Sequence, residues 1–388
     1  MSQLILCACK KNIIVFEEKK TGTISSLFIE QYCRNQQQVV SRRKWSHEGF
    51  GAAFRMDMRP GMEFQEVNVM QSARITGITP VDGGDIIYSC AVGDSSGLFR
   101  CRPGDDIDNE GHVLHDRNVL FEGVTATPDG RMAFSIRNKN GECNIAVGKT
   151  GSSQYREVTE GDSIDRNPAW DPANPDLIYY DSASIGYENN GRPVIGPRAI
   201  LKIELSKGEI EEILGDDNLD YFSPQADSDG NIWCIRRPYA KSKTPVMTFF
   251  DVLLVPVRIG KAVFHAIEFF TYRNTGETLT SAGPNPGKIR TAAPEDLFLE
   301  GVRIDSKKNL RENSRAGELI PGIISRSWEL VRMDPNGDIV CVARGVCSFA
   351  LTGRDSFVFS NGRYVCRSER GKVERIGECG PPCRIAVM

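Results

Sequence analysis

The sequence predicts an all-β fold: a single β-propeller of six blades, or alternatively seven, with a helical insertion between two late blades. The first observation behind this prediction is a turn that recurs before strand-like runs. These turns are Val81–Gly83, Pro128–Gly130, Pro172–Asn174, Ser228–Gly230 and Pro335–Gly337. The second observation is their spacing, because the first three intervals are about 45 to 55 residues, the length of a four-stranded blade. The fourth interval is about twice as long, which predicts an insertion within it.

The clearest single unit is Glu157–Ile213. A Trp-Asp-Pro turn at residues 170–172 leads into the alternating strand Leu177–Tyr180, and a hairpin follows. Proline fixes φ for such a turn, and the Asn or Gly that follows accepts a positive φ. The order strand, turn, strand predicts a small antiparallel sheet. Similar units are expected at Ile75–Val92 and Gly123–Lys149.

Three short runs near the N-terminus are expected to be strands of one blade. They are Leu4–Cys9, Ile13–Glu17 and Ile24–Ile29, separated by lysine-containing turns. The polar stretch Asn35–Lys44 and the region that continues to Met62 carry no pattern that assigns them an element.

Composition and charge place the chain among ordinary globular proteins. It has 388 residues, of which 40% are apolar and 26% are charged, and its formal net charge is −3. A chain of this composition and length buries a substantial core. Because the net charge is small, no overall field attracts nucleic acid or an anionic membrane. Nucleic acid is therefore not expected as a partner.

The chain contains 12 cysteines, but their context argues against a disulfide framework. The apolar run at residues 4–7 precedes the first lysines and is too short for the core of a signal peptide. We therefore expect a cytoplasmic protein with reduced thiols, most of which act as small core side chains.

The repeat resembles that of TolB-type six-bladed β-propellers. The resemblance rests on VTEGDSIDRNPAWDP, LIYYDS and AILKIEL within residues 158–205, and on TPDGRMAFSI at residues 127–136. In that family a Thr-Gly segment leads to Pro-x-Trp-Ser-Pro-Asp-Gly and an Ile-x-Phe strand. Here Asp171 stands where the family usually has Ser, and the family's Trp is absent before Asp82 and Asp129.

The resemblance implies a ring of blades around a central channel, with the last blade completed by the N-terminal strand. On that basis Leu4–Cys9 is expected to join the C-terminal strands Ser356–Ser360, Arg363–Arg367 and Val373–Ile376. It implies little about function, because propellers carry unrelated chemistries.

Residues 244–327 are expected to form an insertion of helix and loop that divides the propeller into residues 1–243 and 328–388. Between Val246 and Tyr272, the polar residues Asp251, Arg258 and His265 stand seven apart, which on a helix leaves one narrow polar stripe. Pro256 is expected to kink this helix. Its wide apolar face consists of Phe249, Phe250, Leu253, Leu254, Ile259, Val263, Phe264, Ile267 and Phe270.

This apolar face is expected to be buried, because monomers rarely expose a surface of that kind. It can pack against its own propeller and the connection that follows, against a protein partner or a second copy, or against a membrane surface. A transmembrane span is disfavoured, since ionisable residues interrupt the segment. The following connection, Asn274–Arg326, is expected to be an irregular surface segment with solvated basic residues.

The motifs in the chain do not predict a catalytic or metal site. Gly93–Gly97 matches Gly-x-Ser-x-Gly, but it joins two expected strands, whereas a nucleophile elbow joins a strand to a helix. Asp227–Asn231 resembles part of a calcium loop, yet it sits at a blade turn and lacks the later acidic residue. His112 and His115 in an acidic loop are a weak metal candidate.

The cysteines include no Cys-x-x-Cys pair, which disfavours a zinc site. If the chain termini meet in one blade, some of these cysteines could gather: Cys7, Cys9, Cys341, Cys347, Cys366, Cys379 and Cys383. We expect no catalytic residue, no bound metal and no cofactor.

Three functions remain open from the sequence. The leading interpretation is a non-enzymatic scaffold that binds a protein partner, or a second copy, through the apolar face of the insertion. The alternative is a metal-dependent hydrolase or lactonase with its site at the channel mouth, although an acidic ligand set cannot be aligned across the blades. A third is peripheral attachment to a membrane through Val246–Tyr272.

Overall fold

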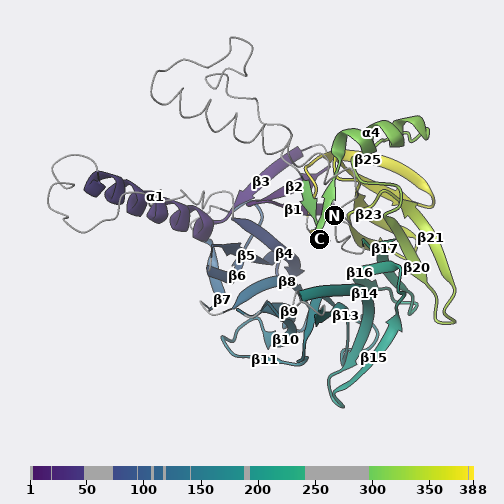
Figure 1. Ribbon diagram of the computed structural model, residues 1–388, viewed down its shortest axis with the longest axis horizontal. Helices are drawn as coiled ribbons and strands as arrows, with labels where there is room; N and C mark the ends of the chain where they lie inside the picture. The colour runs from purple at the N-terminus through teal and green to yellow at the C-terminus, as the bar shows by residue number, and fades with distance from the viewer. Residues whose placement is uncertain are drawn as a thin grey trace, which may run out of the picture. The chain divides into compact units, whose positions relative to one another are not determined.

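The computed structural model describes residues 3–18, 20–47, 73–93, 95–105, 109–116, 119–139, 141–187, 193–240, 297–382 and 384–388. Most of these residues lie in antiparallel sheets arranged around a common centre (Figure 1). Each sheet follows the meander that the turn and strand pattern predicts.

The chain begins and ends in the same sheet, whose order is β26-β1-β2-β3. Its strands are β1 (Leu4–Cys9), β2 (Asn12–Glu17), β3 (Lys20–Ser25) and β26 (Arg384–Val387). The second sheet has the order β4-β5-β6-β7. Its strands are β4 (Arg74–Val81), β5 (Asp85–Val92), β6 (Ser95–Cys101) and β7 (Gly111–Asp116).

The third sheet has eight strands and consists of two four-stranded halves. The first half contains β8 (Leu120–Ala126), β9 (Arg131–Arg137), β10 (Cys143–Lys149) and β11 (Tyr155–Glu157). The second half contains β12 (Ser163–Trp170), β13 (Leu177–Tyr187), β14 (Pro193–Glu204) and β15 (Glu209–Leu214). One parallel pairing, Cys143 with Ile164, joins the halves. Each half is therefore equivalent to one of the other sheets.

Two further sheets complete the ring. The first, in the order β16-β17-β20-β21, contains β16 (Leu219–Ala226), β17 (Ile232–Pro238), β20 (Glu329–Met333) and β21 (Ile339–Arg344). The second contains β22 (Ser348–Gly353), β23 (Ser356–Ser360), β24 (Tyr364–Glu369) and β25 (Lys372–Glu378). The short strands β18 (Leu297–Leu299) and β19 (Val302–Ile304) pair with each other.

The innermost strands of all these units border one central cavity. Residues of β4, β8, β12, β16, β22 and β26 line a cavity of about 580 Å³. With the eight-stranded sheet taken as two units, the described part of the chain contains six four-stranded units. Four-stranded sheets set radially around a channel define a β-propeller. The predicted all-β propeller fold is confirmed.

The ring closes through a strand that the sequence did not predict. β26 pairs with β1, with Ile5 opposite Val387 and Cys7 opposite Ile385. The three C-terminal strands that were expected to take up Leu4–Cys9 instead form a sheet of their own with β22. The prediction that Leu4–Cys9 joins those three strands was therefore wrong, and β26 is its partner. The sequence did not indicate β26, because a four-residue strand is too short to show an alternating pattern.

The insertion lies inside one sheet and not between two blades as expected. β17 and β20 pair directly, from Ile232 opposite Met333 to Arg236 opposite Glu329. Turn spacing could not reveal this, since an insertion lengthens the interval equally wherever it falls. Ala240–Arg303 forms a separate compact unit. The predicted helix Val246–Tyr272 and its apolar face lie outside the described residues.

Two helices occupy segments that the sequence left without one. α1 (Leu27–His47) begins two residues after β3, where a strand through Ile29 was expected. Ser26 Oγ accepts a hydrogen bond from the backbone N–H of Ile29, and such an N-cap favours a helix start over strand continuation. The carboxylate of Glu110 accepts from the backbone N–H groups of Leu27 and Phe28, at 2.9 and 3.0 Å. An acidic group at this end also suits the helix dipole.

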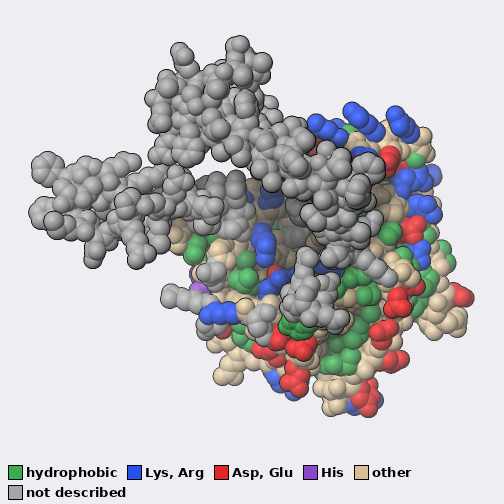
Figure 2. Space-filling model, viewed as in Figure 1, with side chains coloured by type: hydrophobic (Ala, Val, Ile, Leu, Met, Phe, Trp, Pro, Cys, Tyr) green, Lys and Arg blue, Asp and Glu red, His purple; other side chains and the backbone are tan. Residues whose placement is uncertain are grey.

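The second helix, α4 (Ser306–Arg315), falls in the segment that was expected to be irregular. Asp305 caps it by accepting from the backbone N–H of Lys308 at 2.9 Å. The buried Asn313 side chain donates to the carbonyls of Gly322 and Ile324, both at 2.8 Å, and so fixes the chain that follows the helix. Basic side chains of α4 are exposed, as expected, and they are visible above the sheets in Figure 2.

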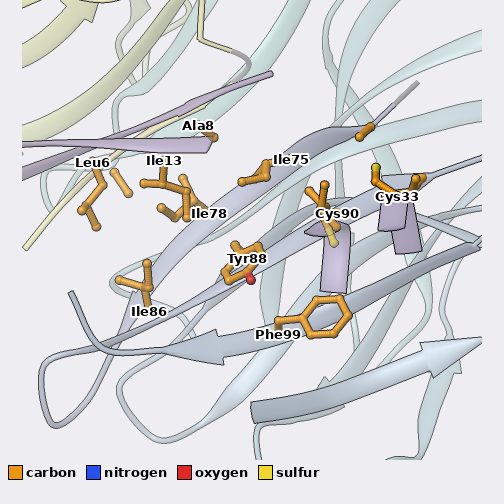
Figure 3. Close-up of a cluster of buried hydrophobic side chains, with 14 residues drawn as sticks. Leu6, Ala8, Ile13, Cys33, Ile75, Ile78, Ile86, Tyr88, Cys90 and Phe99 are labelled. Atoms are coloured by element: carbon orange, nitrogen blue, oxygen red, sulfur yellow. The ribbon is translucent and has the colours of Figure 1, made fainter. Parts of the chain in front are cut away.

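Apolar side chains fill the space between neighbouring sheets. Figure 3 shows one such cluster, in which Leu6, Ala8 and Ile13 of the first sheet meet side chains of the second sheet and Cys33 of α1. Ile86 and Phe99 are fully buried in it. Truncating a buried Leu or Ile to Ala in such a cluster costs about 2 to 5 kcal/mol.

The two ends of the channel differ in what they carry. In each unit the second strand ends beside the start of the innermost strand, as Ala91 opposite Arg74 and Pro238 opposite Leu219 show. We call this side, where innermost strands begin, the entry face. The connection that contains α1 arrives at this face, and the chain leaves β17 for the insertion at the same face. At the opposite end short turns join each innermost strand to the next strand, as between Val81 and Asp85.

Candidate functional site

The central cavity is the first candidate site. Prolines of the inner strands and their turns form much of its wall: Pro80, Pro128, Pro168, Pro172, Pro175 and Pro224. Arg131 stands at the cavity with its guanidinium carbon 4.8 Å from the centroid of the Trp170 ring, a cation–π arrangement. The same guanidinium donates to the carbonyl of Pro175 at 2.5 Å. The wall therefore combines apolar side chains with polar groups, among them the fixed cation of Arg131.

Carboxylates at this cavity hold their own turns. Asp171 Oδ1 accepts from the backbone N–H groups of Ala173 and Asn174, at 2.7 and 3.0 Å, and Oδ2 accepts from the Tyr179 hydroxyl at 3.1 Å. Asp129 accepts from the Thr127 hydroxyl and from Arg131. These two hydrogen bonds, that from Thr127 first, lower the pKa of Asp129. Both acids therefore stabilise their own turns.

The described ranges contain no group of three or more His, Cys, Asp and Glu side chains arranged to hold a metal ion. His112 and His115, the weak metal candidate, lie in β7 with their ring centroids 6.5 Å apart. They pack against aromatic rings instead: His112 against Phe99 and His115 against Phe28. Residues 95–97 of the motif Gly93–Gly97 lie in β6, which pairs with β5 as a hairpin as expected, and Ser96 is buried there.

A second set of polar groups lies at the entry face, where the innermost strands carry β-bulges. Gly123, Asn167 and Ser223 adopt φ values of 66°, 55° and 57° at these bulges. The buried carboxylate of Asp181 joins two of them, because its Oδ1 accepts from Asn167 Nδ2 at 2.6 Å and from Ser223 N at 2.9 Å. Arg198 Nη1 lies 3.6 Å from Oδ2 of the same carboxylate. One side chain thus connects adjacent inner strands.

Glu122 plays a similar role between β4, β9 and β12. Its carboxylate lies within 3.4 Å of Arg74, 2.9 Å of Arg137 and 3.2 Å of Arg166. A buried pair, Asp220 with Arg237 at 2.9 Å, lies at the start of β16, and Asp220 also accepts from the backbone N–H of Arg198 at 3.1 Å. The sequence analysis did not predict this network. The feature that could have indicated it is a charged residue near the start of each of four successive inner strands, β4, β8, β12 and β16.

The third candidate is an apolar surface on the rim, formed by β21, Leu319 and Val373. We call it the β21 surface. β21 is the outermost strand of its sheet (Figure 1), and its residues from Ile339 to Cys341 are exposed. Leu319 beside it is 96% exposed and Val340 is 52% exposed. A groove of about 440 Å³ runs along the surface, lined by Leu319, Val342 and Val373 among others.

Two of the other outer strands, β15 and β25, carry charge along their edges. β15 reads EIEEIL and β25 reads KVERIGE, whereas β21 reads IVCVAR and carries no charge before Arg344. Charged residues are a common way to block pairing at a sheet edge. A bulge near Val342 increases the local twist of β21, but it adds no charge to the edge. The β21 surface is therefore more open to association than the edges of β15 and β25.

The predicted partner-binding residues, from Phe249 to Phe270, lie outside the described residues. Within the described part of the chain, no helix is both long and apolar enough to cross a membrane.

Comparison with known proteins adds a likeness in fold. No model of a protein family matches the sequence, and no characterised protein sequence matches it. TolB from Acinetobacter baumannii is similar in structure, with a TM-score of 0.49, 9% identity, and coverage of 100% of this chain and 66% of the other. A protein assigned as TolB from Agrobacterium tumefaciens gives a TM-score of 0.41 at 12% identity, over 80% of this chain and 84% of the other.

A puromycin-hydrolyzing peptidase from Mycobacterium tuberculosis is also similar, with a TM-score of 0.43, 10% identity, and coverage of 97% of this chain but 45% of the other. These likenesses concern the propeller fold alone. The β-propeller fold of this chain follows from its own sheets around the central cavity.

Proposed function

We propose that this chain is a non-enzymatic propeller scaffold that binds protein partners within a larger cytoplasmic assembly. The observation that carries the proposal is the β21 surface, an uncharged outer strand beside an apolar groove. Neighbouring exposed apolar side chains such as Leu319 and Val340 are typical of protein interaction sites. An exposed strand edge can also accept a partner strand through backbone hydrogen bonds.

The insertion provides a second interaction surface in this proposal. Its predicted helix presents the nine apolar residues from Phe249 to Phe270, and the chain leaves the propeller for it at the entry face. The direct pairing of β17 with β20 supports this role, because the sheet stays intact around the inserted residues. A propeller that tolerates the insertion can present it to a partner or to a second copy.

The test compares full-length variants by affinity capture of the assembly and by native mass. Val340→Lys with Val342→Lys places two charges on the β21 edge, and Phe249→Asp with Phe264→Asp disrupts the predicted helix face. Ile210→Lys is the matched control, because Ile210 is also an apolar residue on an outer strand and is 49% exposed.

We expect the wild type and the Ile210→Lys variant to recover the same partners at the same mass. We expect each double variant to lose partners while keeping its circular dichroism spectrum. Equal recovery and equal mass for all four proteins would refute the scaffold proposal.

A hydrolase with its site at the channel mouth is the second candidate, and the central cavity of about 580 Å³ is the observation that favours it. This function requires a reactive set that the turn-holding acids Asp129 and Asp171 do not provide. Elemental analysis of the purified protein discriminates the two functions, since a stoichiometric metal would favour the hydrolase. Flotation with liposomes that is lost in Phe249→Asp with Phe264→Asp would instead indicate membrane attachment.

A further inference from the structure

Two cysteines that are far apart in sequence meet where the ring closes. Cys9 ends β1 in the first sheet, and Cys379 follows β25 on the connection to β26. Their Sγ atoms lie 3.1 Å apart. A disulfide bond is about 2.05 Å long, so a movement of about 1 Å by the side chains brings the sulfurs to bonding distance.

The surroundings hold this pair in place. Cys379 is buried in the apolar cluster between the first and last sheets, with Cys7, Val358 and Ile385. Its backbone N–H donates to the carbonyl of Arg363 at 3.1 Å, which fixes the chain after β25. Cys9 is only partly buried, so a small oxidant can reach the pair from solvent.

The local hydrogen bonds also favour a reactive sulfur. The thiols of Cys7 and Cys9 hydrogen-bond to the sulfur of Cys379 and lower its pKa. The pKa of Cys7 is raised correspondingly, first by its hydrogen bond to Cys379 and then by burial. These hydrogen bonds favour the thiolate form of Cys379, and the thiolate is the form that reacts with peroxides.

We propose that Cys379 and Cys9 form an oxidative modification site, at which a hydroperoxide converts the two thiols into a disulfide that joins the ends of the propeller. The Cys379 thiolate attacks one peroxide oxygen, breaks the O–O bond and becomes a sulfenic acid, and the other oxygen leaves as water after protonation. Cys9 then attacks the sulfenic sulfur, forms the S–S bond and releases a second water. Two thiols and one hydrogen peroxide give one disulfide and two waters.

This disulfide joins Cys9, at the end of β1 in the first sheet, to Cys379, which follows β25 of the last sheet. The closure otherwise depends on the short β1–β26 ladder and on apolar packing between the sheets. A cross-link across such a long loop constrains the unfolded chain and stabilises the fold. A thiol reductant reverses it, so the ring has a stronger oxidised state and a weaker reduced state.

The test oxidises the reduced full-length protein with one equivalent of hydrogen peroxide and maps disulfides by mass spectrometry without reduction. We expect one peptide pair joining Cys9 to Cys379, the loss of two free thiols, and a rise in Tm of about 4 to 8 °C that dithiothreitol reverses. Cys9→Ser and Cys379→Ser abolish all three changes.

In two matched control variants we expect the cross-linked peptide, the loss of two thiols and the rise in Tm to remain. Cys341→Ser removes an exposed thiol, and Cys347→Ser removes a buried thiol that donates to the carbonyl of Ser360. The mapping in the wild type does not depend on any variant folding. The proposal is overturned if Cys9 and Cys379 stay reduced while exposed Cys341 is oxidised, or if either one pairs with a different cysteine.

Discussion

Replacing Asp181 with Ala tests whether the entry-face network holds neighbouring blades together. The substitution removes the acceptor of Asn167 Nδ2 and of the Ser223 N–H, and the carboxylate that lies 3.6 Å from Arg198. Removing one partner of a buried ion pair costs about 3 to 5 kcal/mol, because the remaining groups stay desolvated. A loss of this size lowers Tm by about 4 to 6 °C in a protein of this length.

The assay is unfolding in urea, followed by tryptophan fluorescence and by circular dichroism, with Tm from calorimetry. Asp355→Ala is the control, since Asp355 is 67% exposed and pairs with Arg332 at 3.5 Å on the surface. We expect that control to change the free energy of unfolding by less than about 1 kcal/mol. A loss below about 1 kcal/mol for Asp181→Ala would show that the bulges do not depend on this carboxylate.

Two further predictions concern packing and titration. Gly77→Ala should cost about 1 to 3 kcal/mol, because its Cβ would lie 2.6 Å from the backbone nitrogen of Val124 on the next inner strand. Gly22→Ala, whose Cβ would meet Val15 at 3.8 Å, should cost less in the same calorimetric assay, and equal losses would contradict this account. Burial alone would raise the pKa of Asp227, but hydrogen bonds from Trp233 and then Asn231 outweigh it and lower the pKa. This carboxylate therefore contributes stability above its unfolded pKa of about 3.9 that is lost as pH falls through the folded pKa. The stability difference between wild type and Asp227→Asn should stay constant from about pH 7 to 5 and shrink below about pH 4; a difference that is unchanged at pH 3 would argue against it.

The sequence determined the repeated unit. Turn residues such as Pro128–Gly130 and the alternation in Leu177–Tyr180 act over a few residues, so their pattern specifies local strands and hairpins without reference to the rest of the chain. Repetition of that unit is sufficient to predict a propeller, because a single small sheet cannot bury its own apolar faces. The acidic turn at Asp227 was also predictable, since the Asp-x-Asp-Gly-Asn spacing is local.

The tertiary structure decided how the ring closes and where its polar groups meet. β26, near the end of the sequence, pairs with β1, near its start. This pairing closes the ring, and it brings Cys9 close to Cys379. Asp181 and Ser223 lie in different inner units, so no local spacing predicts their hydrogen bond. The charged starts of the inner strands were visible in the sequence, but their pairing depends on which strand lies next to which. Contacts between distant segments leave no periodic pattern, and the fold supplies them only once the sheets have packed around the channel.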